Sequence, residues 1–226
     1  MNKRIGIVAL LGALVIGIPG VLYNSRAADT ADADTQPNSD SVPLQDDMAE
    51  ARTKGSLDAP LTMFEFADFQ CSACKILFDS TIPLLIEEYI DTGKLKLIFL
   101  NFPIGQIHPN APVAHEFAMC AAQQERFWEV HDLLYRNQTS WAELDDPRDY
   151  FLVLADSAVL QRDSLDACLQ SGAIAALIQS EFEAAYRAGI QSTPSLVLEG
   201  GLITGAIPME SLRPLLDSLY EARVQN

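Results

Sequence analysis

The apolar positions of this chain divide it into three parts. An uncharged run from Ile5 to Tyr23 follows the basic pair Lys3-Arg4, and this order is typical of a segment that directs a chain out of the cytoplasm. Large apolar residues are then nearly absent from Ala28 to about Thr53, so this stretch cannot bury enough surface to fold. Dense apolar runs resume at Ala59. The pattern predicts a signal peptide or membrane anchor at 1–27, a flexible acidic linker at 28–53 and one folded domain at 54–226.

Within the folded domain the apolar spacing alternates between that of strands and that of helices. Pro60–Phe69 and Lys94–Leu100 are dense in apolar and aromatic residues, which is typical of buried strands. Between them, Ile76–Ile90 repeats apolar residues at helical spacing, and we expect Pro83 to kink this helix. The order strand–helix–strand predicts a parallel pair of strands joined by a right-handed crossover.

The second half of the domain is predicted to be helical until close to its end. Four consecutive helical stretches follow without a strand among them, and a hairpin and one amphipathic helix complete the chain. The predicted helices cover 111–138, 146–160, 163–170 and 173–189, the hairpin strands 195–198 and 202–204, and the last helix 209–223. We therefore expect an α/β fold in the order βαβ, all-helical insertion at about 108–189, ββα.

The N-terminal run has two interpretations. Its 19 residues from Ile5 to Tyr23 exceed the core of an ordinary signal peptide and approach the roughly 20 residues that span a bilayer, which favours a retained membrane anchor. Gly17-Ile-Pro-Gly20 and the small-x-small sequence Ser25-Arg-Ala27 favour a cleaved signal peptide instead. Both interpretations place the domain outside the cytoplasm, in an oxidising compartment such as the periplasm.

Composition and charge narrow the class of protein. The chain has 226 residues, 49% of them apolar, and a formal net charge of −16, which is typical of a soluble folded domain. The acidity argues against nucleic-acid binding, because no cluster of Lys and Arg is available to follow a phosphate backbone. Four cysteines are too few for a disulfide scaffold, and a domain of this size folds without one.

The sequence Cys71-Ser-Ala-Cys74 lies where the first predicted strand passes into its helix. A C-x-x-C pair at this junction indicates redox chemistry. The helix N-terminus stabilises a thiolate at Cys71, and the spacing places Cys74 one turn later, within reach of a mixed disulfide formed at Cys71. The alternatives are an inert structural disulfide and half of a zinc site. A zinc site would need Cys120, Cys168 or histidines as further ligands, and the chain has no second close-spaced ligand pair.

Thr193-Pro194 lies between the helical insertion and the predicted hairpin. A proline that begins a strand can take the cis form, and a cis-proline at this position would face the C-x-x-C pair. An ordinary trans-proline at the start of a strand is the alternative.

The remaining cysteines, Cys120 and Cys168, both lie in the helical insertion. In an exported protein their even number favours a structural disulfide, which would close a loop of about 47 residues and would not be catalytic. Two buried free thiols are the alternative.

Three segments of the chain resemble one known family. The segments Phe64–Lys75, Phe127–Leu133 and Gly189–Ser195 are similar to motifs of the DsbA-like thiol:disulfide oxidoreductases. The resemblance covers about residues 54–226 and implies a thioredoxin-like fold with an inserted helical domain.

The same resemblance implies roles for individual residues. Cys71 would be the exposed nucleophile and Cys74 the more buried, resolving thiol. Thr193 and a cis Pro194 would provide the backbone against which a substrate segment lies. Glu65 matches a buried acid that moves protons to and from the cysteine pair, and a solvated acid on a strand is the alternative.

We therefore predict an exported protein-disulfide oxidoreductase that oxidises cysteines of secreted or periplasmic proteins through a mixed disulfide. By resemblance, a membrane quinone-linked oxidase of the DsbB or VKOR type would reoxidise it. Ser72-Ala73 departs from the Pro-His or Pro-Tyr that strongly oxidising members often have between the cysteines, so the direction of electron flow stays open. A reductase or isomerase that uses the dithiol, and a non-catalytic peptide-binding or chaperone module, are the alternatives. No metal, flavin or nucleotide cofactor is implied, and we expect a monomer because the sequence shows no dimerisation domain like that of the dimeric isomerases.

Overall fold

The computed structural model describes residues 48–225. The N-terminal segment predicted at 1–27, and the predicted linker up to residue 47, lie outside the described residues. The predicted boundary of the linker at residue 53 is wrong. Arg52 is fully buried, and strand β1 (Thr53–Lys54) begins at Thr53. None of the helices in the described range is long and apolar enough to cross a membrane.

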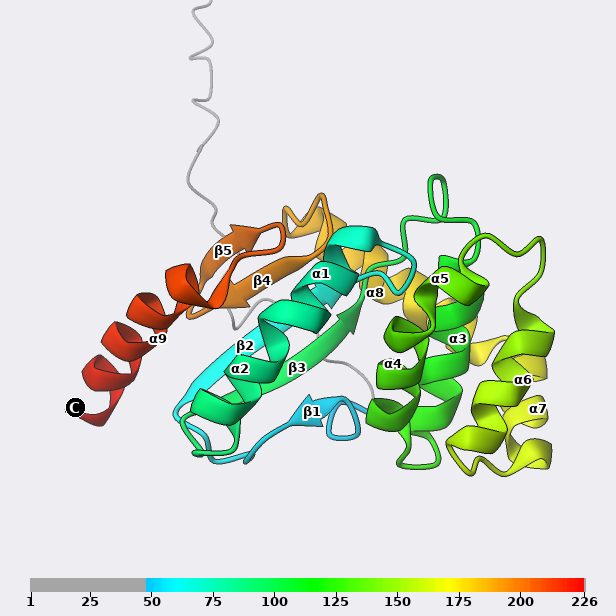
Figure 1. The fold of residues 1–226 in the computed structure, drawn as a ribbon, viewed down its shortest axis with the longest axis horizontal. Helices are drawn as coiled ribbons and strands as arrows, with labels where there is room; N and C mark the ends of the chain where they lie inside the picture. The colour runs from blue at the N-terminus through cyan, green and yellow to red at the C-terminus, as the bar shows by residue number, and fades with distance from the viewer. Residues whose placement is uncertain (1–47, 226) are drawn as a thin grey trace, which may run out of the picture. The chain divides into compact units, whose positions relative to one another are not determined.

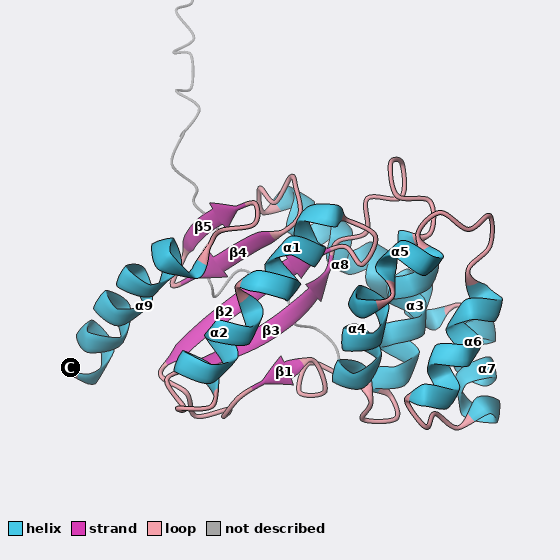
Figure 2. Cartoon of the chain, viewed as in Figure 1, coloured by secondary structure: helices cyan, strands magenta, loops and turns pink. Residues whose placement is uncertain are grey.

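A five-stranded sheet lies between two layers of helices (Figure 2). Strands β2 (Leu61–Ala67) and β3 (Leu95–Asn101) run parallel, as the strand–helix–strand order predicts. Strand β1 pairs antiparallel with β3, and β4 (Ser195–Leu198) pairs antiparallel with both β2 and β5 (Gly201–Thr204). The order across the sheet is β1-β3-β2-β4-β5, so the expected βαβ and ββα parts are confirmed.

Different helices cover the two faces of the sheet (Figure 1). Side chains alternate between the faces along β2, so Leu61 and Met63 belong to one apolar cluster and Phe64 and Phe66 to another. Glu65 shares the face of Met63, towards the helix that follows β2. The first face is covered by α1 (Ser72–Ser80), α2 (Ile82–Leu85), the π-helical turn η2 (Ile86–Ile90) and α9 (Met209–Val224), and the second by α8 (Ala173–Arg187).

The segment between β3 and β4 is all-helical and has an apolar core of its own. Phe117, Leu134, Trp141 and Phe151 are among its most buried residues, and the rings of Phe117 and Phe151 stack at 5.2 Å. This confirms the predicted helical insertion. Besides α8 it contains α3 (Ala111–Ala122), α4 (Phe127–Arg136), α5 (Gln138–Trp141), α6 (Arg148–Ser157) and α7 (Arg162–Ser171).

Two helix predictions are wrong in detail. The helix expected over 111–138 is two helices, α3 and α4, because the chain turns after Ala122 and Glu125 adopts a left-handed φ of 57°. Neither glycine nor proline marks this break, so the helical spacing of apolar residues continues through it. The helix expected over 76–90 is interrupted at Thr81, and Pro83 lies in the first turn of a separate helix, where proline is well tolerated.

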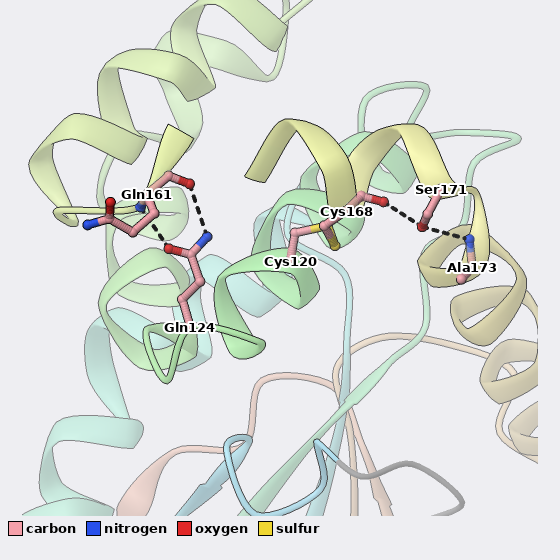
Figure 3. Close-up of a disulfide and its surroundings, with 6 residues drawn as sticks. All are labelled: Cys120, Gln124, Gln161, Cys168, Ser171 and Ala173. Atoms are coloured by element: carbon pink, nitrogen blue, oxygen red, sulfur yellow. Dashed lines mark hydrogen bonds between the residues drawn. A yellow bond between two sulfur atoms is a disulfide. The ribbon is translucent and has the colours of Figure 1, made fainter. Parts of the chain in front are cut away.

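Cys120 of α3 and Cys168 of α7 form a disulfide (Figure 3). Both residues are buried. Next to it, Ser171 Oγ donates to the carbonyl oxygen of Cys168 at 2.7 Å. The backbone N–H of Gln161, the N-cap residue of α7, donates at 2.7 Å to Oε1 of Gln124, which follows the end of α3. The disulfide joins α7 to α3, the first helix of the insertion, and the Gln161–Gln124 hydrogen bond joins the residues next to these helices.

Candidate active site

Cys71 and Cys74 lie at the junction between β2 and α1. Cys71 is the N-cap residue of α1, with extended backbone angles of φ −69° and ψ 124°. Its carbonyl oxygen accepts the first helical hydrogen bond, from the backbone N–H of Lys75 at 3.1 Å. Cys74 follows one turn later and is fully buried, whereas Cys71 is 7% exposed. Both are free thiols, so the structure holds the dithiol form of the pair.

The surroundings of Cys71 stabilise its thiolate. A hydrogen bond from the Cys74 thiol lowers the pKa of Cys71 to about 5, with further contributions from Thr193 and from the backbone N–H groups of Cys74 and Ala73, and against the opposing effect of partial burial. The two N–H groups belong to the first turn of α1, whose unpaired amides and dipole favour negative charge. A thiolate at Cys71 is both a nucleophile and a good leaving group.

Burial favours the protonated forms of Cys74 and Glu65. Burial raises the pKa of Cys74 well above its ordinary value, and the hydrogen bond to Cys71 and the charges of Cys71 and Glu65 add to the rise. Glu65 on β2 is 2% exposed, and its Oε2 has no hydrogen-bond partner among residues 48–225. Burial raises the pKa of Glu65 to about 7. A carboxyl group with this pKa is suited to exchange a proton with a nearby thiol.

The structure brings Thr193 and Pro194 to Cys71. The peptide bond between Thr193 and Pro194 is cis, and the Cys71 thiol lies 3.5 Å from the carbonyl oxygen of Thr193, 122 residues away in sequence. The Thr193 hydroxyl is buried and has no partner in the described part of the chain, so it is free to donate to the thiolate. Pro194 leads directly into β4, and its carbonyl oxygen accepts from the backbone N–H of Gly205 at 2.8 Å.

The turn that carries Cys71 is held by contacts that the sequence analysis missed. Asp68 is fully buried, and its carboxylate accepts hydrogen bonds from the backbone N–H groups of Gln70 and Ile104, each at 2.8 Å. Gln70 Nε2 donates to the carbonyl oxygen of Ala142 at 2.7 Å. An Asp between a strand and the C-x-x-C pair is the signal of an Asx turn and could have been recognised. The hydrogen bonds to Ile104 and Ala142, which lie far away in the sequence, cannot be recognised from a sequence pattern.

The remaining predicted residues, Cys120 and Cys168, are bonded to each other and contribute no thiol to this site. Within residues 48–225, no group of three or more His, Cys, Asp or Glu is arranged to hold a metal ion. The groups brought together near Cys71 are two thiols, a buried carboxyl group and a cis-proline loop, and they can support thiol–disulfide exchange.

Known proteins are similar to this chain in sequence or in fold over most of the domain. A family model described as thioredoxin matches residues 48–218. The probable disulfide bond formation protein D of Bacillus cereus is 32% identical over 151 residues, which are 66% of this chain and 69% of that protein. Part of the Na(+)/H(+) antiporter NhaA 3 of Salinispora tropica is 29% identical over 179 residues, but the match covers 79% of this chain and only 26% of the antiporter. The crystal structure of Wolbachia pipientis α-DsbA1 has a TM-score of 0.70 and 24% identity, over 81% of this chain and 95% of that one.

These similarities agree with the observed geometry. The family match includes β1 to β5, the helical insertion and most of α9. In this chain the C-x-x-C pair lies at the start of α1 and the cis-proline loop lies beside it. The chain therefore belongs to the thioredoxin family and, within it, to the DsbA-like thiol:disulfide oxidoreductases.

Proposed function

We propose that this enzyme is a disulfide donor that works outside the cytoplasm, with Cys71 as the nucleophilic cysteine and Cys74 as the resolving one. The observation that carries the proposal is the set of hydrogen bonds around the Cys71 sulfur, which lowers its pKa to about 5. Stabilisation of this thiolate favours the dithiol form of the pair over the disulfide. A pair that prefers to be reduced transfers its disulfide readily to other proteins.

Oxidation of a substrate takes two exchange steps. A substrate thiolate attacks the Cys71 sulfur of the Cys71–Cys74 disulfide, a mixed disulfide forms, and Cys74 leaves as a thiolate that takes a proton from Glu65. A second substrate thiolate attacks the substrate sulfur of the mixed disulfide, and Cys71 leaves as a thiolate. The substrate gains a disulfide and loses two electrons, which the enzyme holds as its dithiol.

The Thr193-Pro194 loop positions the substrate in this proposal. The Thr193 carbonyl oxygen lies 3.5 Å from the Cys71 sulfur, so a peptide that brings a sulfur atom to Cys71 must pass beside the loop. Proline has no backbone N–H to donate, which leaves the backbone of Thr193 to make hydrogen bonds with an extended substrate segment.

A membrane quinone-linked oxidase of the DsbB or VKOR type is the proposed acceptor of the two electrons. The sequence resemblance supports this partner, and the uncharged run at 5–23 supports an extracytoplasmic location whether it anchors the chain or is cleaved as a signal peptide. An anchor would keep the domain at high effective concentration near a membrane oxidase. We propose that the enzyme acts as a monomer, which light scattering of the purified chain would test.

The reduction potential of the Cys71–Cys74 pair tests the direction of electron flow. The full chain is equilibrated with glutathione buffers, and the dithiol fraction is measured by alkylation. We expect a potential nearer to about −120 mV, typical of a strong oxidant, than to about −270 mV, typical of thioredoxin. A value at the thioredoxin end would overturn the proposal and favour a reductase that depends on an electron supply.

Two variants test the assigned roles of the cysteines. Cys71→Ser is expected to abolish oxidation of a reduced model substrate, because the variant can form neither the Cys71–Cys74 disulfide nor the mixed disulfide. Cys74→Ala cannot form the Cys71–Cys74 disulfide, so it is tested with a disulfide-bonded model substrate: its Cys71 thiolate attacks that disulfide, and the mixed disulfide is expected to accumulate because the resolving thiol is lost. Full activity of the Cys71→Ser enzyme would contradict the mechanism.

A further inference from the structure

One side chain of the helical insertion, Gln138, makes two hydrogen bonds to the active-site turn. It is the first residue of α5 and is 6% exposed. Its Nε2 donates to the carbonyl oxygen of Phe69 at 2.7 Å and to that of Cys71 at 3.0 Å. These two carbonyl groups flank Gln70, so one amide group holds both ends of the segment that leads into the nucleophile.

The carbonyl group of Cys71 has a particular connection to its sulfur. Rotation about the Cα–C bond of Cys71, described by ψ, moves the side chain relative to the carbonyl group and to the amides of α1. At the observed ψ of 124°, the sulfur lies where the N–H groups of Ala73 and Cys74 stabilise its charge. A hydrogen bond to the Cys71 carbonyl oxygen restrains this rotation. The hydrogen bond to the Phe69 carbonyl oxygen restrains the backbone just before Cys71.

Gln138 is itself held at a fixed junction between α4 and α5. Asn137, the residue before it, accepts a hydrogen bond from the Tyr150 hydroxyl at 3.1 Å. Trp141, three residues later, donates through Nε1 to the carbonyl oxygen of Leu134 at 2.8 Å. These hydrogen bonds hold the residues on either side of Gln138, the helix end from which its amide group reaches the active-site turn.

The amide group of Gln138 also acts electrostatically. Its NH₂ end carries partial positive charge and points at the backbone of Cys71. Because Gln138 is buried, water screens this partial charge weakly.

We propose that Gln138 is a positioning residue for disulfide exchange: by donating to Phe69 and Cys71 it holds the nucleophile where the first turn of α1 stabilises its thiolate. The helical insertion then takes part in setting the reactivity of Cys71, in addition to covering the active site. This inference rests on the proposed nucleophilic role of Cys71.

A purely structural role makes a different prediction. Two buried carbonyl groups need hydrogen-bond donors wherever they lie, and loss of a donor costs stability in any case. A change in stability therefore cannot separate the two roles. The pKa of Cys71 and the reduction potential can, because they change only if the environment of the sulfur changes.

The test compares three variants of the full chain. Gln138→Glu keeps the shape but replaces the donating NH₂ with oxygen, Gln138→Met removes the donor without adding charge, and Gln170→Glu is the matched control, since Gln170 is exposed on α7. The pKa of Cys71 is measured from the pH dependence of alkylation of the dithiol form, and the reduction potential is measured against glutathione. We expect both Gln138 variants to raise the pKa of Cys71. For Gln138→Glu the expected rise is about one unit, which is a tenfold increase in the proton affinity of the thiolate. Their reduction potentials should become more negative, and Gln170→Glu should match the unaltered enzyme.

Folded Gln138 variants whose Cys71 pKa and reduction potential match those of the unaltered enzyme would overturn the proposal. If Gln138→Glu fails to fold, Gln138→Met decides alone. Failure of the proposed function would look different, because Cys71 of the unaltered enzyme would then titrate near the ordinary cysteine value of about 8.5.

Discussion

Arg52 and Glu181 form a buried ion pair that joins segments 129 residues apart. Arg52 Nη2 lies 2.7 Å from Glu181 Oε1 and Nη1 lies 3.1 Å from Oε2. The side chain of Asn101, at the end of β3, donates to Glu181 Oε2 at 2.7 Å and lies 2.7 Å from Nδ1 of His115. Burial lowers the pKa of His115 to about 3, so the ring is neutral. Its Nε2 accepts from the backbone N–H of Phe69, so Nδ1–H donates to Asn101 Oδ1. The pair and its neighbours connect the residues before β1 with α8, β3 and α3.

Breaking this pair should be costly, because it leaves an uncompensated charge in the interior. We expect Arg52→Ala to lower the free energy of unfolding by about 3–5 kcal/mol, measured by urea denaturation. The control is Arg187→Ala, which breaks an exposed ion pair with Glu183 on α8 and should change stability little. Equal losses in the two variants would show that the Arg52 pair does not hold the N-terminal segment to the domain.

The hydrogen bond from Cys74 to Cys71 is the largest single cause of the low pKa of Cys71. We expect Cys74→Ala to raise this pKa by about one unit or more, because the donor is lost. Cys74→Ser keeps a donor in the same place and should raise it less. The pH dependence of alkylation measures both, and an equal pKa in the two variants would exclude the hydrogen bond as the cause.

The disulfide between Cys120 and Cys168 joins residues 48 positions apart in sequence. In the chain-entropy account, a loop of this length contributes about 4 kcal/mol by restricting the unfolded chain. We expect the double variant Cys120→Ala/Cys168→Ala to lose about this much stability in urea denaturation. Its Cys71–Cys74 reduction potential should stay unchanged, and a shift would mean that the disulfide also affects the active site.

The sequence predicted those features of the fold and site that depend on local patterns. The C-x-x-C junction, the parallel strands and the helical insertion each follow from residue types at short spacing. The break near Glu125 was missed because Ala122 to Phe127 contains no helix breaker. Strand β1 was missed for another reason: its segment has few apolar residues and is held by Arg52, whose partner Glu181 lies in α8.

Gln138 and Asp68 of the site were not predicted from the sequence, and for the same reason. Gln138 and Asp68 act through hydrogen bonds to backbone groups of the active-site turn. Almost every residue type carries the same backbone carbonyl and N–H groups, so a hydrogen bond to the backbone cannot be recognised from a pair of residue types in the sequence. Cys71, Cys74 and Thr193-Pro194 could be predicted because side-chain chemistry or proline geometry makes them distinctive.

Glu65 makes the stability of the dithiol enzyme depend on pH. Burial raises the pKa of Glu65 from 4.5 to about 7. Between these values the Glu65 carboxyl keeps a proton in the folded protein that it has released in the unfolded chain, so the contribution of Glu65 to stability falls as pH rises through this window. Above about pH 7 the cost is complete, and the shift corresponds to about 3 kcal/mol.

Replacement of Glu65 by glutamine should remove this cost, because glutamine does not ionise. We expect Glu65→Gln to be more stable than the unaltered enzyme at pH 8, by up to about 3 kcal/mol, and to differ much less at pH 4. Urea denaturation of both proteins under reducing conditions measures the two differences. Cys71 titrates in both proteins, so its contribution cancels to first order in the difference between their free energies of unfolding. A stability difference that is the same at pH 4 and pH 8 would show that Glu65 does not titrate in this range and would remove it as the proton donor to Cys74.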